Sequence, residues 1–154
     1  YYPFSSVELF LSSENTLMID APLVCDDTLQ TNDIARIYPD GSFTILGRKD
    51  NVINSGGIKV QAEEIERLLQ SSIPVPFVIT SVPDRRLGQA VTLLIEGQME
   101  ISALETKLES VLASYYRPKY IYTVNHIPQT GNGKINRKEC RVLAESLQLL
   151  GRQE

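Results

Sequence analysis

Apolar and polar residues alternate in short stretches over the first third of the chain. A period of two residues predicts β-strands, and Pro39-Asp40-Gly41 between the last two stretches is a strong turn sequence. The intervening segment 22–33 is polar and predicts a loop. Four short strands bury too little apolar surface for a core of their own, so we expect residues 1–49 to be the terminal β segment of a larger domain. The predicted strands are residues 7–12, 16–21, 34–38 and 42–46.

Past residue 50 the pattern becomes mixed. Apolar residues recur at helical spacing over 62–70, and the continuous apolar runs 75–82 and 90–96 are typical of buried strands. The resulting order β-turn-β, α, β, β, α, β, α predicts an α+β domain over residues 50–154, with a small mixed sheet and packed helices. The other predicted elements are a hairpin over 52–60, a helix from Ser102 to 113 with a Ser102–Glu105 capping box, a strand over 120–124, and a helix to 150 opened by an Asn136–Glu139 capping box.

Charge and composition exclude several classes of protein. A net charge of −4 with no Lys/Arg cluster argues against binding to nucleic acid or to a membrane surface. No apolar run approaches the roughly 18 residues of a membrane span. With His126 as the single histidine we expect no metal site, and Cys25 and Cys140 are expected to be free thiols in a reducing cytoplasm. The chain begins with neither Met nor a signal-peptide pattern, so we expect it to be cut from a longer protein.

The segment from Pro128 to Ile135 is the first candidate for chemistry. Two glycines beside Lys134 give a flexible backbone that presents an ammonium, which can neutralise charge developing on a phosphate or carboxylate. It is not a P-loop, because that motif needs a glycine in place of Pro128 and a hydroxyl in place of Ile135. The spacing alone favours a surface loop with a solvated lysine.

Six other positions are candidates on residue type. Arg48 and Asp50 lie between the two pieces of different architecture, where hinge residues occur, although an isolated Arg-x-Asp is more often a solvated pair. Asp33 can accept hydrogen bonds from vicinal hydroxyls or cap a turn. The pair Gly56-Gly57 lets a ligand run along the backbone or forms a tight hairpin turn, and Lys59 is by default a solvated cation. A solvated helix face is the better interpretation of Glu63, Glu64 and Glu66.

Three motifs, taken in order, resemble the C-terminal part of the acyl-adenylate-forming enzymes, which include acyl-CoA synthetases and the adenylation domains of peptide synthetases. Thr31-Asn32-Asp33 looks like the end of the family's T-G-D motif, with Asn32 where glycine is usual. Gly47-Arg48-Lys49-Asp50, followed by Gly57 and by Glu63 to Glu66, looks like G-R-x-D…G…E-I-E. The segment from Pro128 to Lys134, with Arg137, looks like P-x-T-x-x-G-K-x-x-R.

The resemblance implies a two-step reaction, in which a carboxylate and ATP give acyl-AMP and a thiol, usually that of coenzyme A, then displaces AMP. It implies that Asp33 and Arg48 hold the ribose and that Asp50 is the hinge of a mobile domain, residues 50–154. It also implies that Lys134 is catalytic in adenylation. In the second step Gly56 and Gly57 would line the CoA tunnel, and Lys59 would meet nucleotide phosphate.

The family's phosphate loop, adenine-binding segment and acyl pocket lie upstream of these motifs, so ATP and Mg²⁺ would be bound mainly by an N-terminal domain outside this sequence. We therefore expect this polypeptide alone to be inactive. Within the family the sequence from Gly47 to Lys59 resembles bacterial 2-succinylbenzoate–CoA ligases of menaquinone synthesis. Another acyl-CoA synthetase, an adenylation domain that loads a carrier protein, and a free-standing interaction domain remain alternatives.

Overall fold

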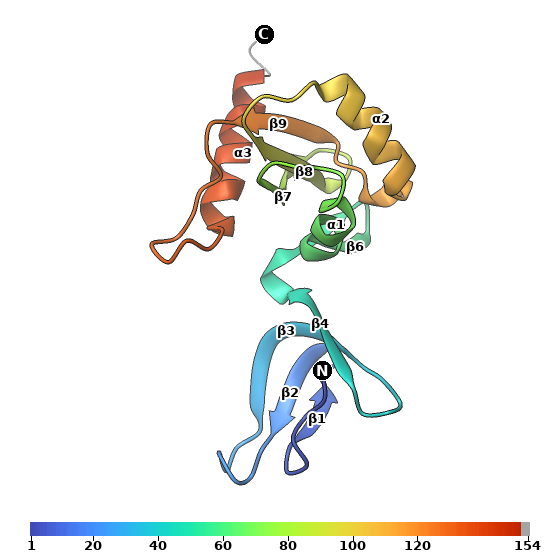
Figure 1. The fold of residues 1–154 in the computed structure, drawn as a ribbon, viewed down its shortest axis with the longest axis vertical. Coiled ribbons are helices and arrows are strands. Elements are labelled where there is room, and N and C mark those ends of the chain that lie inside the picture. Colours follow the sequence, from blue (N-terminus) through green and yellow to red (C-terminus); the bar gives the residue numbers. More distant parts are fainter. Residues whose placement is uncertain (152–154) are drawn as a thin grey trace. The chain divides into compact units, whose positions relative to one another are not determined.

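The computed structural model describes residues 1–151 of the chain. They form two compact units, the first comprising Tyr1–Asn51 and the second beginning at Val52 (Figure 1). The sequence predicted a change of architecture at residue 50. The further assignment of the two pieces to a large domain and a mobile domain remains a prediction.

The first unit is an antiparallel meander of four strands in the order β1-β2-β3-β4. The turn between the first two strands contains Asn15, whose φ of 61° is in the left-handed region that asparagine tolerates. A one-turn 3-10 helix, η1 (Lys49–Asn51), follows the last strand. The strands are β1 (Glu8–Leu11), β2 (Thr16–Asp20), β3 (Leu29–Ile37) and β4 (Phe43–Arg48).

The third strand begins earlier than the sequence predicted. Residues 29–33 were expected to belong to a polar loop, but they pair with β2 in the register Ile19↔Leu29 and Met18↔Gln30. The hydroxyl of Thr31 also donates to the Leu17 carbonyl at 2.9 Å. None of residues 29–33 is buried. A strand segment with no buried side chain shows no apolar alternation, so the sequence pattern could not reveal it.

The second unit contains a five-stranded mixed sheet in which β6, β5, β8 and β7 are successive neighbours and β9 pairs with β8. The β8–β9 pairing is parallel and the other pairings are antiparallel. The predicted fold class, α+β with a small mixed sheet and packed helices, is therefore confirmed. The elements are β5 (Val52–Ser55), β6 (Ile58–Gln61), α1 (Ala62–Leu69), β7 (Phe77–Asp84), β8 (Gly88–Glu96), α2 (Ile101–Val111), the 3-10 turn η2 (Ser114–Tyr116), β9 (Tyr120–Val124) and α3 (Arg137–Gly151).

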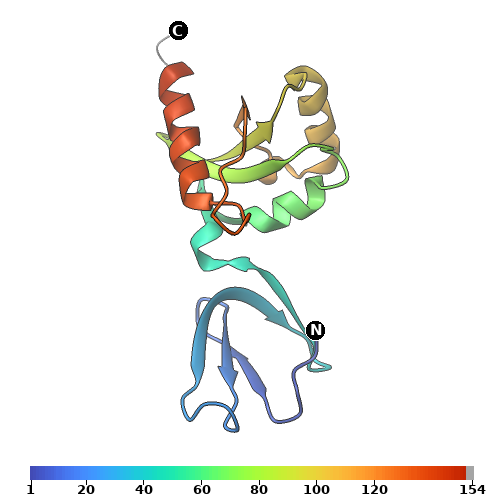
Figure 2. The ribbon, with the colours of Figure 1, turned by 60° about the vertical axis from the view of Figure 1, so that its left-hand side comes forward.

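Helices cover both faces of this sheet (Figure 2). Alternate side chains of β7 and β8 point to opposite faces, as the period of two requires. On one face Ile79 and Leu93 join a buried cluster with α1 and α2. On the other face Val78 and Leu94 join a second cluster with α3. The two continuous apolar runs in the sequence are explained by this arrangement, because a strand buried on both faces has no polar side.

Helix α2 begins differently from its prediction. The sequence placed a Ser102–Glu105 capping box at its start, but the helix starts at Ile101 and Glu100 is its N-cap residue. The Ser102 hydroxyl donates to the Glu100 carboxylate at 2.9 Å and caps no backbone amide. The capping prediction for α3 is supported by Asn136, whose Oδ1 accepts from the Glu139 amide at 3.2 Å.

Candidate functional site

Asp33 and Arg48 are brought together by the pairing of β3 with β4. They lie opposite each other in the register, and Arg48 Nη1 is 3.3 Å from Asp33 Oδ1. Their side chains are 32% and 52% exposed, so the ion pair itself adds little stability. It does present a carboxylate acceptor and guanidinium donors side by side on the surface of the first unit. Asp33 lies within β3, whereas the sequence placed it at the junction of a loop and a strand.

The candidate hinge residue Asp50 is exposed in the 3-10 turn η1, one residue before the first unit ends. Its neighbour Lys49 is held by an ion pair with Glu14, with Nζ 2.6 Å from Oε2. The turn is therefore fixed on one side to the first unit, and the chain enters the second unit two residues after Asp50.

Gly56 and Gly57 form the two-residue turn of the β5–β6 hairpin, with Ser55 paired to Ile58. Their φ values of 60° and 83° are left-handed, which explains two successive glycines. Gly56 also approaches the β7–β8 turn closely. Its amide donates to the Leu87 carbonyl at 2.9 Å, and a Cβ at this position would meet Leu87 Cδ2 at 3.2 Å. A Cβ on Gly57 would meet open space, so this turn residue is accessible to a ligand.

Lys59 is exposed on β6 opposite Asn54. No hydrogen bond or ion pair restrains its ammonium within residues 1–151. The hairpin thus offers an accessible turn and a cation at one edge of the sheet.

Lys134 lies on a closed hairpin, whereas the sequence predicted a flexible loop. Gln129 pairs with Ile135 in an antiparallel bridge, and the Thr130 amide donates to the Lys134 carbonyl at 2.7 Å. Gly133, with a φ of 76°, allows the reversal of the chain. In the described part of the chain no partner binds the Lys134 ammonium. The backbone of this lysine is fixed while its charge is available.

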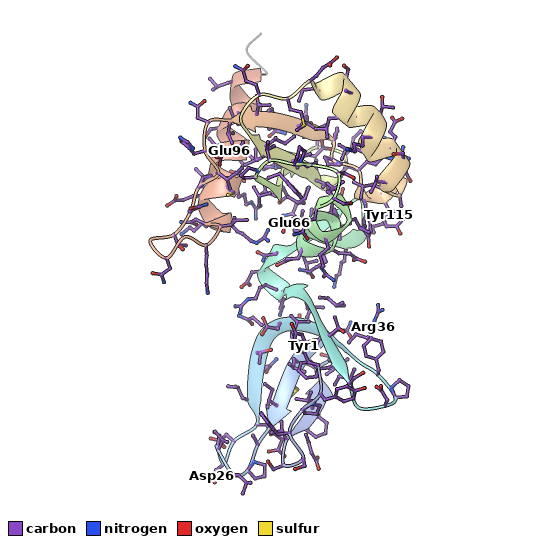
Figure 3. All side chains as sticks on the ribbon, viewed as in Figure 1. Tyr1, Asp26, Arg36, Glu66, Glu96 and Tyr115 are labelled. Atoms are coloured by element: carbon purple, nitrogen blue, oxygen red, sulfur yellow. The ribbon has the colours of Figure 1, made fainter. Side chains whose placement is uncertain are left out.

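Glu66 and Arg137 form an ion pair that the sequence interpretation missed. The Glu66 carboxylate, expected on a solvated helix face, lies on α1 (Figure 3). This side chain is only 18% exposed. Its two oxygens accept from Arg137 Nη1 and Nη2 at 2.9 and 2.8 Å. Both residues belong to quoted motifs, the end of E-I-E and the end of G-K-x-x-R. The two motifs mark both residues as candidates, but nothing in the sequence indicates that they contact each other.

The described residues contain two free thiols and no side-chain cluster that could hold a metal ion. Burial raises the pKa of the Cys140 thiol on α3 to about 11, so this thiol stays protonated at neutral pH, and Cys25 is an exposed free thiol. The resemblance implies Mg²⁺, but the described residues contain no cluster of three or more His, Cys, Asp or Glu side chains that could hold it. The residues present therefore do not form a magnesium site by themselves. Among the helices of residues 1–151, none has the length and apolar character needed to cross a bilayer.

The chain has relatives among known ligases and synthetases, although no protein-family model matches it. It is 38% identical over 126 residues to triostin synthetase I of Streptomyces triostinicus, which covers 79% of this chain and 24% of the relative. It is 34% identical over 113 residues to the 2-succinylbenzoate–CoA ligase of Lactococcus lactis, covering 73% and 25%. It is 31% identical over 149 residues to a mitochondrial acyl-coenzyme A synthetase of Mus musculus, covering 90% and 26%.

The chain belongs to the acyl-adenylate-forming family. It spans about a quarter of the length of these curated relatives. A solved acyl-CoA synthetase (AMP-forming)/AMP-acid ligase II-like protein from Dyadobacter fermentans is 29% identical, with a TM-score of 0.57 over 91% of this chain and 42% of that one. The o-succinylbenzoate CoA synthetase of Bacillus subtilis shares the fold at 19% identity, with a TM-score of 0.76 over 89% of this chain and 34% of that one.

Proposed function

We propose that the full-length protein is an AMP-forming acid–thiol ligase, and that residues 50–154 are its mobile C-terminal domain. The observation that supports this most is the Lys134 hairpin of a chain that belongs to the adenylate-forming family. A cation with a fixed backbone and a free ammonium can stabilise charge that develops as a carboxylate meets a phosphate. Such preorganised charge is worth most where water is excluded.

In the first step of the proposed reaction, a carboxylate oxygen of the substrate attacks the α-phosphorus of ATP, and pyrophosphate leaves. Lys134 would contact the acyl carboxylate and the phosphate oxygens in this step. The Asp33–Arg48 pair would bind the ribose, with the carboxylate accepting from its vicinal hydroxyls and the guanidinium donating to oxygen. ATP and Mg²⁺ would be held mainly by residues outside this chain.

In the second step the thiol sulfur of coenzyme A attacks the acyl carbon, and AMP leaves. The Gly56-Gly57 turn would line the pantetheine path and Lys59 would contact nucleotide phosphate. These groups belong to the β5–β6 edge of the sheet, whereas Lys134 precedes the helix that packs on β7. Two different surfaces of one unit can serve one reaction centre in turn if that unit rotates, so we propose that the chain pivots at Asp50.

We propose 2-succinylbenzoate as the acid and menaquinone synthesis in the cytoplasm as the setting. The support is the sequence from Gly47 to Lys59 and the 34% identity to the ligase of Lactococcus lactis. The relatives with other names are similarly close, so another acyl-CoA synthetase is the main alternative. The 38% identity to triostin synthetase I favours, as a second candidate, transfer of the acyl group to a carrier protein.

The test is ATP–pyrophosphate exchange by the full-length protein with 2-succinylbenzoate, fatty acids, aromatic acids and amino acids. Exchange that depends on one acid is the expected result, followed by AMP release when coenzyme A is added. Exchange with coupling only to a pantetheine-bearing carrier protein would support the second candidate. Absence of exchange with every acid would contradict the proposal and support an interaction domain. The 154-residue polypeptide alone is expected to give no exchange.

A further inference from the structure

The Glu66–Arg137 pair joins two segments that are far apart in the sequence but belong to two of the quoted motifs. Its two parallel bonds make the planar, bidentate geometry in which arginine binds a carboxylate most specifically. The Glu66 side chain is 18% exposed and that of Arg137 is 27% exposed, so water screens this pair less than the chain's surface pairs. Each of these two side chains is therefore held in one orientation by the other.

The pair also occupies the open edge of strand β7. The Ile79 amide donates to Glu66 Oε1 at 2.9 Å, and the Ile79 carbonyl accepts from Arg137 Nη1 at 3.4 Å. One carboxylate and one guanidinium therefore take the place of a neighbouring strand at this residue. Backbone groups at a sheet edge need such partners, and here the partners come from α1 and α3. The first residue of α3 is consequently attached to the central sheet.

Only two residues, Ile135 and Asn136, lie between Lys134 and Arg137. Between them, the Asn136 amide donates to the Pro128 carbonyl at 2.9 Å, which closes the base of the hairpin beside the ion pair. The bridge between Gln129 and Ile135 continues this closure towards Lys134. A continuous set of bonds thus runs from the edge of β7, through Arg137, to the backbone that presents the lysine.

We propose that Glu66 and Arg137 are positioning residues for Lys134, and that they set the place from which its ammonium meets the acyl carboxylate and α-phosphate. This inference rests on the proposed function. It assigns the pair to the first half-reaction alone, because the Gly56-Gly57 turn and Lys59 lie at the β6–β5 edge, on the opposite side of the sheet order from β7. A misplacement of about 1 Å at a reacting group can cost about 100-fold in rate.

The test measures each half-reaction of the full-length protein by single turnover in Arg137→Lys and Glu66→Gln. Arg137→Lys keeps the charge but cannot make the two parallel bonds, and Glu66→Gln keeps the shape but removes the negative charge. We expect acyl-AMP formation to fall by about 100-fold in both variants. Thioester formation from supplied acyl-AMP is expected to stay close to that of the unmodified protein.

The matched control is Arg141→Gln. Arg141 is on the same helix and pairs with Glu145 at 3.2 Å, but its side chain is 48% exposed and, among residues 1–151, it makes no hydrogen bond to a strand. This variant is expected to leave both half-reactions unchanged. A loss in Arg141→Gln as large as that in Arg137→Lys would show a general effect of charge on α3 and would overturn the inference.

A second measurement applies if the variants are destabilised. Hydrogen exchange of the 154-residue polypeptide should show faster exchange at Thr130 and Gly133 in Arg137→Lys, with the amides of β8 unchanged. Unchanged hairpin exchange, or an equal loss in both half-reactions, would contradict a positioning role. If the unmodified full-length protein forms no acyl-AMP with any acid, the proposed function fails first. Active unmodified protein with fully active variants would overturn the inference alone.

Discussion

The two units of this chain differ in how much of the apolar surface of their sheets is buried. In the second unit helices pack on both faces of the sheet, and Leu93 and Leu94 of one strand are fully buried on opposite sides. In the first unit the only buried apolar residues are Leu17 and Ala35. Large apolar side chains remain exposed along it, namely Tyr1, Tyr2, Phe4, Phe10, Leu11, Leu23, Val24, Leu29 and Tyr38.

Buried apolar residues and candidate site residues are distributed differently between the two units. The second unit has the interior of an independently stable domain, whereas the first unit resembles part of a sheet whose apolar surface needs a partner. Yet both units carry candidate site residues, the Asp33–Arg48 pair in the first and Lys59 and Lys134 in the second. The two sets of candidate residues therefore belong to two units with different degrees of burial. The boundary between these units follows Asn51.

The largest expected effect comes from removing a core side chain of the second unit. Leu93→Ala should lower its free energy of unfolding by about 2–5 kcal/mol, because it removes packing on the α1–α2 face and leaves a cavity. The matched change in the first unit, Phe10→Ala, should cost under about 0.5 kcal/mol, because this side chain is already 45% exposed. Chemical denaturation followed by circular dichroism measures both. Equal losses would contradict the contrast between the units.

A smaller effect is expected from acid. The Lys119 ammonium, 2.5 Å from Asp84, and the amides of Leu87 and Arg86 hold the pKa of the Asp84 carboxyl well below its usual range. Because the folded pKa is the lower one, this stabilisation is present above about pH 4 and is lost as the pH falls below it. Thermal unfolding between pH 2 and pH 6 should therefore show a weaker acid dependence in Asp84→Asn.

The first unit supplies the control for this titration. Hydrogen bonds from Ser42 and from the Tyr2 hydroxyl also lower the pKa of Asp40, but this carboxylate lies at an exposed turn. Asp40→Asn should leave the acid dependence of the second unit unchanged. A second-unit transition that responds to Asp40 and not to Asp84 would reverse the assignment.

Local patterns in the sequence predicted most of the second unit. The strand Tyr120–Val124 has the predicted bounds, and α1 starts at the predicted residue, because apolar periodicity reflects burial directly. The beginning of β3 could not be predicted in this way, since Leu29 and Gln30 are exposed although they are paired in the sheet. Sequence periodicity indicates which face of a strand is buried. It gives no signal for a strand segment in which neither face is buried.

The candidate site was predictable as a set of residues but not as a set of contacts. Asp33 and Arg48 were assigned to one ligand from their motifs, and the β3–β4 register places them opposite each other. The Glu66–Arg137 pair joins residues separated by 71 positions, and no local pattern encodes such a contact. A glutamate on a short amphipathic helix is usually solvated, and here the open edge of β7 makes the difference.

The central claim is that groups at opposite edges of one sheet act in different half-reactions. The direct test compares Lys134→Ala with Lys59→Ala in the full-length protein, by measuring acyl-AMP formation and thioester formation from supplied acyl-AMP. The account predicts that Lys134→Ala blocks the first step and spares the second, and that Lys59→Ala slows only the second. Equal losses in both steps for both variants would contradict it.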